Sequence, residues 1–364
     1  MTADSSMRLM DADGHIVEDL SDLATFMDPA IRWVVSKERP FASCVGAFPM
    51  LDGVHNLTRY AEGGMIPKNR QRVHASSGRP GSPADWKALL DKTGLEHTVM
   101  VTSDGLGIGQ LRNRDYLRLI CRAYNDYVSE RFARFDRRQH PLALIPMQYP
   151  SDGAEELRRA VKELGLLGAM IPSTGLQMHV AQEYYWPVYR EAAELDCVLA
   201  FHGGSNRGIG LDSFSSLTAS HILHHSTPLM IAFVSLVFDR VFDRFPGLRI
   251  AFLEGGCGWV AFVLDRIHRD STFEGHYDTA GHRRLRELLE EGNILIGCEG
   301  NDSIIPYLSK TIGVKTLAFS SDYPHESDLN DVTHEIEETL ASSELTRDEK
   351  AAIVGGNARA FFRL

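Results

Sequence analysis

Eight short apolar segments recur along the chain, and a stretch with helical spacing of apolar residues follows each of them. Most are continuous apolar runs rather than alternating ones, as expected of strands buried on both faces of a parallel sheet. The eight segments are residues 8–13, 97–102, 141–146, 167–172, 196–202, 249–254, 293–298 and 316–321. This alternation predicts an α/β protein, and eight units predict a (β/α)8 TIM-type barrel. A doubly wound open sheet is disfavoured, because no Gly-x-Gly-x-x-Gly turn suited to a dinucleotide follows any segment.

Residues 20–90 interrupt the alternation after the first predicted strand. They are rich in Gly, Pro, Ser and Arg, with scattered aromatic residues. So long a segment without regular structure is unusual unless it is functional. We therefore interpret it as an insertion over the barrel mouth; an irregular surface segment that mediates dimerisation is an equal alternative. A bare barrel needs about 250 residues, so the 364 residues are interpreted as one decorated barrel domain.

Composition and charge exclude several classes of protein. The formal net charge is −11 and no Lys/Arg cluster is present, which argues against nucleic-acid binding. No apolar run reaches the roughly 18 residues of a membrane span, and the first ten residues lack the features of a signal peptide. Five scattered cysteines without a Cys-x-x-Cys pair predict neither a disulfide framework nor a zinc knuckle. We expect a cytoplasmic homodimer or larger oligomer.

Acidic and imidazole side chains stand at the ends of predicted strands, where barrel active sites lie. Asp13 and His15 close the first strand two residues apart, so both side chains point to one side. His202 ends the fifth strand and is followed by two glycines. An acidic oxygen and imidazoles that converge on one point are what a divalent metal requires.

Two more carboxylates occupy equivalent positions. Glu254 ends the sixth strand, where it would serve as a metal ligand, an acid or base, or the carboxylate that orients a metal-bound His. Asp322 follows the eighth strand, as a metal ligand, a base, or both. The helix after His202 begins with a cluster of imidazoles, and spacing leaves open which member faces the site. The cluster is His221, His224 and His225.

Six motifs resemble the amidohydrolase superfamily, and within it the amidohydrolase 2 branch, which includes aminocarboxymuconate-semialdehyde, γ-resorcylate and 5-carboxyvanillate decarboxylases. They are DADGHIVE (11–18), RAYNDYVSERF (122–132), ELRRAVKELGLLGAMIP (156–172), FHGG (201–204), FDRFPGLRIAFLEGGCGWV (242–260) and SSDYPH (320–325). The resemblance implies metal ligands at Asp13, His15, His202 and Asp322. There are two departures: Asp13 stands where His or Glu is usual, and Glu254 stands where the decarboxylases have a catalytic His.

The resemblance implies first a mononuclear Zn²⁺ or Mn²⁺ enzyme, a decarboxylase or hydrolase of a small carboxylate-bearing substrate. Asp322 would act as the base, and Glu254 or His225 as the proton carrier. An anionic substrate needs local cations besides the metal. The candidates are Arg70, Arg72 and Arg207.

Two alternatives remain. Glu18, His225 and Glu254 would also suit a second metal, as in members of the branch that are similar to dinuclear iron or manganese oxygenases. A set of O and N ligands without thiolates suits Fe/Fe or Fe/Mn. A non-catalytic partner subunit is the third hypothesis, which the nearly complete ligand set disfavours.

Overall fold

The computed structural model describes residues 7–32, 73, 75–204, 208–211, 214, 217–271, 280–325 and 327–364. Within them, nine parallel strands form two sheets, ordered β1-β2-β3 and β4-β5-β6-β7-β8-β9. The strands are β1 (Met10–Ile16), β2 (His97–Thr102), β3 (Gln139–Pro141), β4 (Ala143–Leu144), β5 (Gly168–Pro172), β6 (Val198–His202), β7 (Arg249–Leu253), β8 (Ile294–Cys298) and β9 (Leu317–Phe319). Strands thus form at each of the eight predicted positions.

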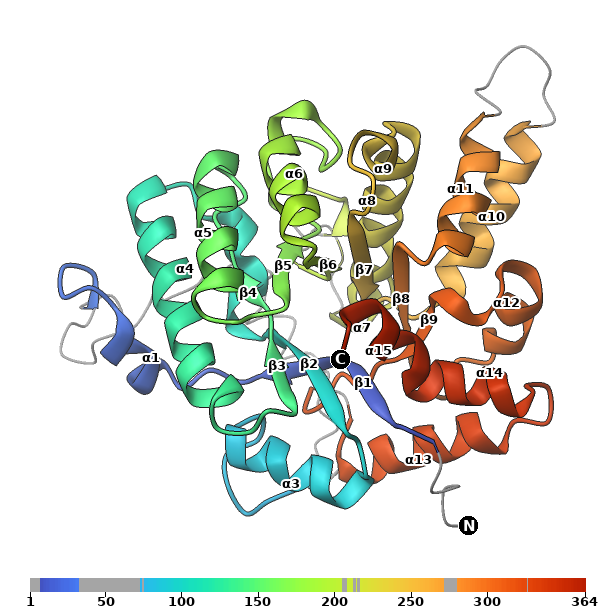
Figure 1. Ribbon diagram of the computed structural model, residues 1–364, viewed down its shortest axis with the longest axis horizontal. Helices are drawn as coiled ribbons and strands as arrows, with labels where there is room; N and C mark the ends of the chain where they lie inside the picture. Colours follow the sequence, from blue (N-terminus) through green and yellow to red (C-terminus); the bar gives the residue numbers. More distant parts are fainter. Residues whose placement is uncertain are drawn as a thin grey trace.

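Many of the helices lie outside the strands, and Figure 1 shows α4, α5, α6 and α8 in chain order across the view, with α10, α11 and α12 beyond them. The α-helices are α1 (Leu20–Phe26), α3 (Pro83–Thr93), α4 (Arg114–Val128), α5 (Pro150–Lys162), α6 (Trp186–Leu195), α7 (Leu217–His224), α8 (Ser226–Phe238), α9 (Val241–Arg244), α10 (Gly258–Ser271), α11 (Ala280–Glu291), α12 (Ile305–Ile312), α13 (Leu329–Ala341), α14 (Arg347–Ala351) and α15 (Asn357–Phe362). Short 3-10 or π turns complete the regular structure: η4 (Asp104–Gln110), η5 (Ser129–Ala133), η6 (Glu183–Tyr185), η8 (Val314–Thr316) and η9 (Ala352–Gly356).

The third predicted strand, 141–146, is divided in two. Gln139–Pro141 and Ala143–Leu144 flank Leu142, whose N–H donates to the carbonyl of Met100 at 2.8 Å. Pro141 has no N–H to donate, and β3 and β4 pair with different neighbours. The two pieces therefore occupy one strand position and join the two sheets.

The first and last strands approach each other just beyond the end of β9. The N–H of His15 donates to the carbonyl of Tyr323 at 2.8 Å, and that of Asp322 donates to the carbonyl of Asp13 at 2.9 Å. β1 also runs three residues further than predicted, with a register irregularity between Asp11 and Gly14. These contacts bring both ends of the strand series to the predicted site.

The predicted insertion contains regular structure at both of its ends, α1 and α3, while residues 33–72 lie outside the described residues. Its last part packs on β1: the indole N–H of buried Trp86 donates to the carbonyl of His15 at 2.8 Å. A Cβ at Gly14 would lie 2.3 Å from the Trp86 ring, so only glycine fits there. Coverage of the barrel mouth by the insertion stays a prediction.

One helical stretch in the described part of the chain, Ala219–Phe238, is long and apolar enough to cross a membrane. Length and composition alone are weak grounds, because core helices pass the same test, and 39% of the apolar window is buried within the protein.

Candidate metal centre

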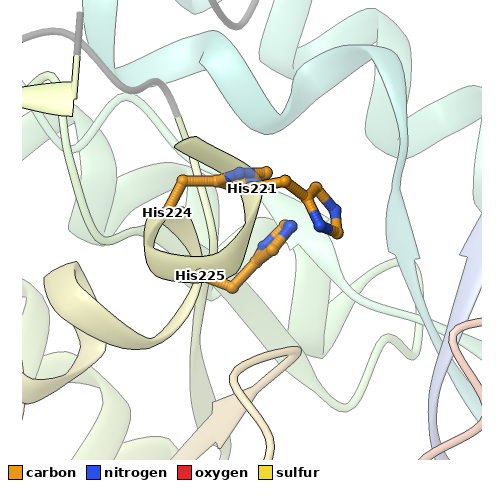
Figure 2. Close-up of side chains that lie close together, drawn as sticks. All are labelled: His221, His224 and His225. Atoms are coloured by element: carbon orange, nitrogen blue, oxygen red, sulfur yellow. The ribbon is translucent and has the colours of Figure 1, made fainter. Parts of the chain in front are cut away.

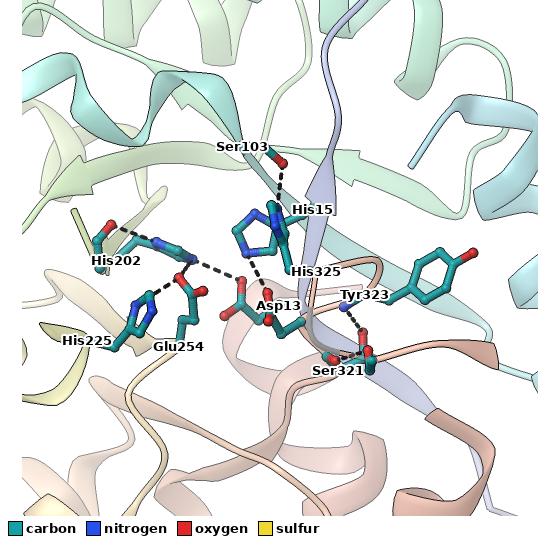
Figure 3. Close-up of polar contacts among 12 residues, drawn as sticks. Asp13, His15, Ser103, His202, His225, Glu254, Ser321, Tyr323 and His325 are labelled. Atoms are coloured by element: carbon teal, nitrogen blue, oxygen red, sulfur yellow. Dashed lines mark hydrogen bonds and ion pairs between the residues drawn. The ribbon is translucent and has the colours of Figure 1, made fainter. Parts of the chain in front are cut away.

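Two site residues lie side by side on β1. Asp13 and His15 are fully buried and separated by Gly14, so the alternation of the strand directs both toward the same face. Figure 3 shows them pointing toward the side chains that arrive from β6 and from beyond β7 and β9. The predicted pairing of Asp13 and His15 is thus seen in the structure.

The other predicted ligands meet this pair. His202, the last residue of β6, has its Nε2 at 3.7 Å from Asp13 Oδ1. Asp322 Oδ1 lies 3.1 Å from His15 Nε2. Three of these residues each offer a ligand atom, and the three atoms lie within 4.8 Å of one another, close enough to share an ion. They are Asp13, His15 and His202.

The electrostatics of this cluster fit a divalent cation. Burial raises the pKa of Asp13 well above its usual value and lowers the pKa of His15 to about 3. Burial opposes a charge on His202 too, but Glu254 and Asp13 outweigh it and raise the pKa of His202 to about 10. Both oxygens of Asp13 are buried without a hydrogen bond in the described structure. A cation would satisfy these oxygens and bind neutral His15.

Two carboxylates of the site have an unusual backbone. Glu254 has φ 57° and Asp322 has φ 50°, in the left-handed region that non-glycine residues rarely adopt. Gly256 follows with φ 58°. Strained backbone of this kind clusters at functional sites, and Figure 3 shows the Glu254 carboxylate turned toward His202 and His225.

Glu254 links the first cluster to the histidines after β6. Its Oε2 lies 3.0 Å from His202 Nε2 and 3.3 Å from His225 Nδ1. The charges of His225 and His202 outweigh burial and lower the pKa of Glu254 well below its usual value. His225 separates α7 from α8, which were predicted as one helix, and His224 is buried, with its pKa lowered by burial to about 2.

Glu18 is the one predicted ligand that the structure places in other contacts. Its carboxylate binds the hydroxyl of Thr102 and accepts from the backbone N–H groups of Ser103 at 3.3 Å and Asp104 at 3.0 Å. It therefore holds the turn after β2, and no contact in the described structure joins it to His225 or Glu254. The role of Glu18 as a metal ligand stays a prediction.

His325 is a site residue that the sequence reasoning missed. Its ring lies edge-on to His15, with centroids 4.3 Å apart, and its Nε2 is 2.7 Å from the hydroxyl of Ser103. His15, Asp322 and His325 form a second group whose ligand atoms fall within 4.8 Å. The signal was present, since His325 ends the SSDYPH motif three residues after Asp322.

Asp11 was also missed. Fully buried, it accepts from Thr98, from Ser321 and from the backbone N–H of Asp13, so it supports the backbone on both sides of the site. The expected cationic residues cannot be placed, because Arg70, Arg72 and Arg207 lie outside the described residues.

Comparison with known proteins decides the family. The model of the amidohydrolase family Amidohydro_2 matches residues 78–364. The chain belongs to this family. It is 24% identical to γ-resorcylate decarboxylase of Polaromonas sp., over 76% of this chain and 86% of that protein. It is 25% identical to 2-amino-3-carboxymuconate-6-semialdehyde decarboxylase of Dictyostelium discoideum, over 66% of this chain and 65% of that protein. These relatives confirm the prediction of an enzyme of this kind.

Solved structures confirm the barrel fold. An amidohydrolase from Mycobacterium avium subsp. paratuberculosis covers 98% of both chains with TM-score 0.72 and 18% identity. The 5-carboxyvanillate decarboxylase of Novosphingobium aromaticivorans, complexed with manganese and 4-hydroxy-3-methoxy-5-nitrobenzoic acid, has TM-score 0.65 and 16% identity, covering 99% of this chain and 97% of that one.

Proposed function

We propose that this amidohydrolase is a metal-dependent decarboxylase, a carbon–carbon lyase that acts on a small carboxylate-bearing substrate, with hydrolysis as the other reaction its site suits. The observation that carries the proposal is that Asp13, His15 and His202 share one buried point, with Asp322 at 3.1 Å from His15. The decarboxylase relatives favour carboxylate removal over hydrolysis.

The four converging residues would hold Zn²⁺ or Mn²⁺. When bound, such an ion supplies a Lewis acid for the substrate carboxylate and a neighbouring hydroxyl. The donor set of two imidazoles and two carboxylates fits both ions. Manganese is present in the structure of the 5-carboxyvanillate decarboxylase.

The proton that replaces the departing carboxyl group must come from the protein. Glu254 and His225 are the proposed proton carriers, and Glu254 Oε2 lies 3.3 Å from His225 Nδ1. Asp322 has the alternative role of base, which hydrolysis requires.

The decisive experiment compares three variants in metal content and in CO₂ release from a panel of hydroxybenzoates with a carboxylate next to the hydroxyl. We expect His202→Ala and Asp322→Ala each to lose the metal and more than 99% of the activity, with the fold retained by circular dichroism. His334→Ala, an exposed histidine on α13, is the matched control and should behave as wild type. Full activity in either site variant would remove the basis of the proposal.

A dinuclear iron or manganese oxygenase is the second candidate function. The observation that favours it is Glu254 itself, which stands between His202 and His225 in place of the expected His. A mononuclear site with Glu254 as proton carrier keeps its metal in Glu254→Gln, whereas a dinuclear site that uses Glu254 as a ligand loses metal. Incorporation of labelled oxygen into product would identify the oxygenase directly.

We also propose that a second copy of this chain covers α8. The helix has no charged residue from Ser226 to Phe238 and exposes Ile231, Val234 and Phe238 at helical spacing. Phe262, on the neighbouring α10, is 60% exposed. The net charge of −11 disfavours an anionic lipid surface as the alternative occupant. Val234→Asp should shift a dimer toward monomer in sedimentation, whereas a wild-type monomer that binds neutral vesicles would favour lipid.

A further inference from the structure

We propose that His221, His224 and His225 hold a second divalent cation, with Glu254 placed between it and the ion of the first cluster. The inference deepens the proposed function, because the second ion would lie in the same site. It differs from the sequence-based hypothesis in its ligands, since Glu18 is engaged elsewhere.

The three histidines are brought together by the break between two helices. His221 and His224 lie on the last turn of α7, and His225 stands between α7 and α8. Spacing of three and four residues puts them on one face of the helical turn. Figure 2 shows the three rings turned toward one another.

The ring geometry is close to that of a ligand set. Ring centroids lie 4.6 Å apart for His221 and His224, 5.2 Å for His221 and His225, and 3.6 Å for His224 and His225. One nitrogen from each ring falls within 4.8 Å of the others. Imidazole nitrogens bind Zn²⁺ at about 2.0–2.1 Å, so nitrogens around one ion stand roughly 3–4 Å apart. Small rotations of the three side chains would therefore bring their nitrogens to the distances that one shared ion requires.

The polar atoms of the cluster point to a missing partner. Nδ1 of His224 is buried and makes no hydrogen bond in the described structure, and Nδ1 of His225 lies 3.3 Å from Glu254 Oε2. Buried polar atoms normally have a hydrogen-bond partner or a ligand. Packing of the imidazoles alone would explain the close, tilted rings of His224 and His225, but it leaves Nδ1 of His224 without a partner in the described structure.

Glu254 supplies the anionic component. Its Oε2 contacts His202 of the first cluster at 3.0 Å and His225 of the second at 3.3 Å. Three imidazoles and one carboxylate, without a thiolate, suit Zn²⁺, Co²⁺ or Fe²⁺. A carboxylate shared between two ions accounts for the choice of Glu at the end of β7, where a His would reach only one.

The test counts ions in purified full-length protein that has been stripped and reloaded with Co²⁺, by elemental analysis and visible absorption. We expect two ions per chain in the wild type and one in His221→Ala, in His224→Ala and in His202→Ala. His334→Ala is the matched control and should keep two. His224 is buried, so His224→Ala could fail to fold. In that case the ion count of His221→Ala decides the test.

The two proposals fail in different ways. One ion in the wild type, lost in His202→Ala and kept in His221→Ala, overturns the second site and leaves the proposed function standing. Two ions retained in both His221→Ala and His224→Ala also overturn it. Absence of any tightly bound Co²⁺ in the wild type overturns both proposals. A visible spectrum altered by His221→Ala, together with the loss of one ion, supports the second site.

Discussion

Tyr323 ties the site to the segment before α3, and replacing it with Phe isolates that connection. Its hydroxyl donates to Asp85 Oδ2 at 2.7 Å and accepts from the N–H of Ala75 at 3.2 Å. Tyr323 and Asp85 are fully buried. The residue before it is Asp322, and its own carbonyl accepts the N–H of His15. Tyr323→Phe removes only the hydroxyl and leaves the ring in place.

The magnitude follows from the two lost contacts. A hydrogen bond to a charged group contributes about 1.5–3 kcal/mol, and the unsatisfied Ala75 N–H costs about 1 kcal/mol more. We expect the free energy of unfolding of the metal-free protein to fall by about 2.5–4 kcal/mol. Because residues that orient ligands change metal affinity about 10–100-fold, we expect weaker metal binding at the Asp322 site in that range.

Urea denaturation of the metal-free protein and a Zn²⁺ titration measure the two effects separately. Tyr307→Phe, on the exposed side of α12, is the matched control and should change neither. Wild-type stability in Tyr323→Phe would show that the buried contact with Asp85 does not form. Lower stability with unchanged Zn²⁺ affinity would refute the role of this connection in positioning Asp322.

Three further predictions concern charge and backbone. In thermal unfolding, metal at 100 times its dissociation constant should raise the free energy of unfolding of the wild type by about 2.7 kcal/mol. The same metal concentration should not change the stability of His202→Ala. Burial, and then the charge of Glu299, raise the pKa of Glu335 to about 8 from 4.5. The folded chain thus keeps a proton that the unfolded chain loses, and stability falls as pH rises from about 4.5 to 8. In urea denaturation, the free energy of unfolding of Glu335→Gln should exceed that of the wild type by up to about 4 kcal/mol at pH 8 and equal it near pH 4.5. An equal gain at both pH values would refute the raised pKa of Glu335. At Glu254, where φ is 57°, Glu254→Gly should be more stable than Glu254→Ala by about 1 kcal/mol, the reverse of the usual order.

The fold and the first cluster were predictable because they depend on periodicity. Continuous apolar runs identified the strands, and parallel strands of a barrel bring their carboxyl ends to one rim. A spacing of two residues on a strand was enough to place Asp13 and His15 together. His202 and Asp322 followed from the same rule, applied to strands more than a hundred residues apart.

What sequence periodicity missed depends on local backbone geometry. The positive φ of Glu254 and Asp322 decides where their carboxylates point, and no propensity scale predicts that conformation for an acidic residue. The break between α7 and α8 at His225 does not follow from the sequence, because apolar spacing persists through it. Glu18 accepts from the backbone N–H groups just after β2, a contact that spacing on the first strand does not predict.

Charge balance at the rim connects these observations. Asp13, Glu254 and Asp322 bring three carboxylates to one buried site, a charge of −3 when all are ionised. One divalent cation leaves −1, and an incoming substrate carboxylate makes −2, which a buried site tolerates poorly. Two divalent cations leave +1, which the same substrate carboxylate neutralises. Without an ion, bound protons reduce the negative charge of the site. The pKa of Asp13 is raised, and the pKa of His202 is raised to about 10. A protonated His202 cannot bind a metal, so proton and cation compete for the same nitrogen. Glu254 adds one negative charge to the site, and the neighbouring histidine cluster offers the ligands for a cation that compensates it.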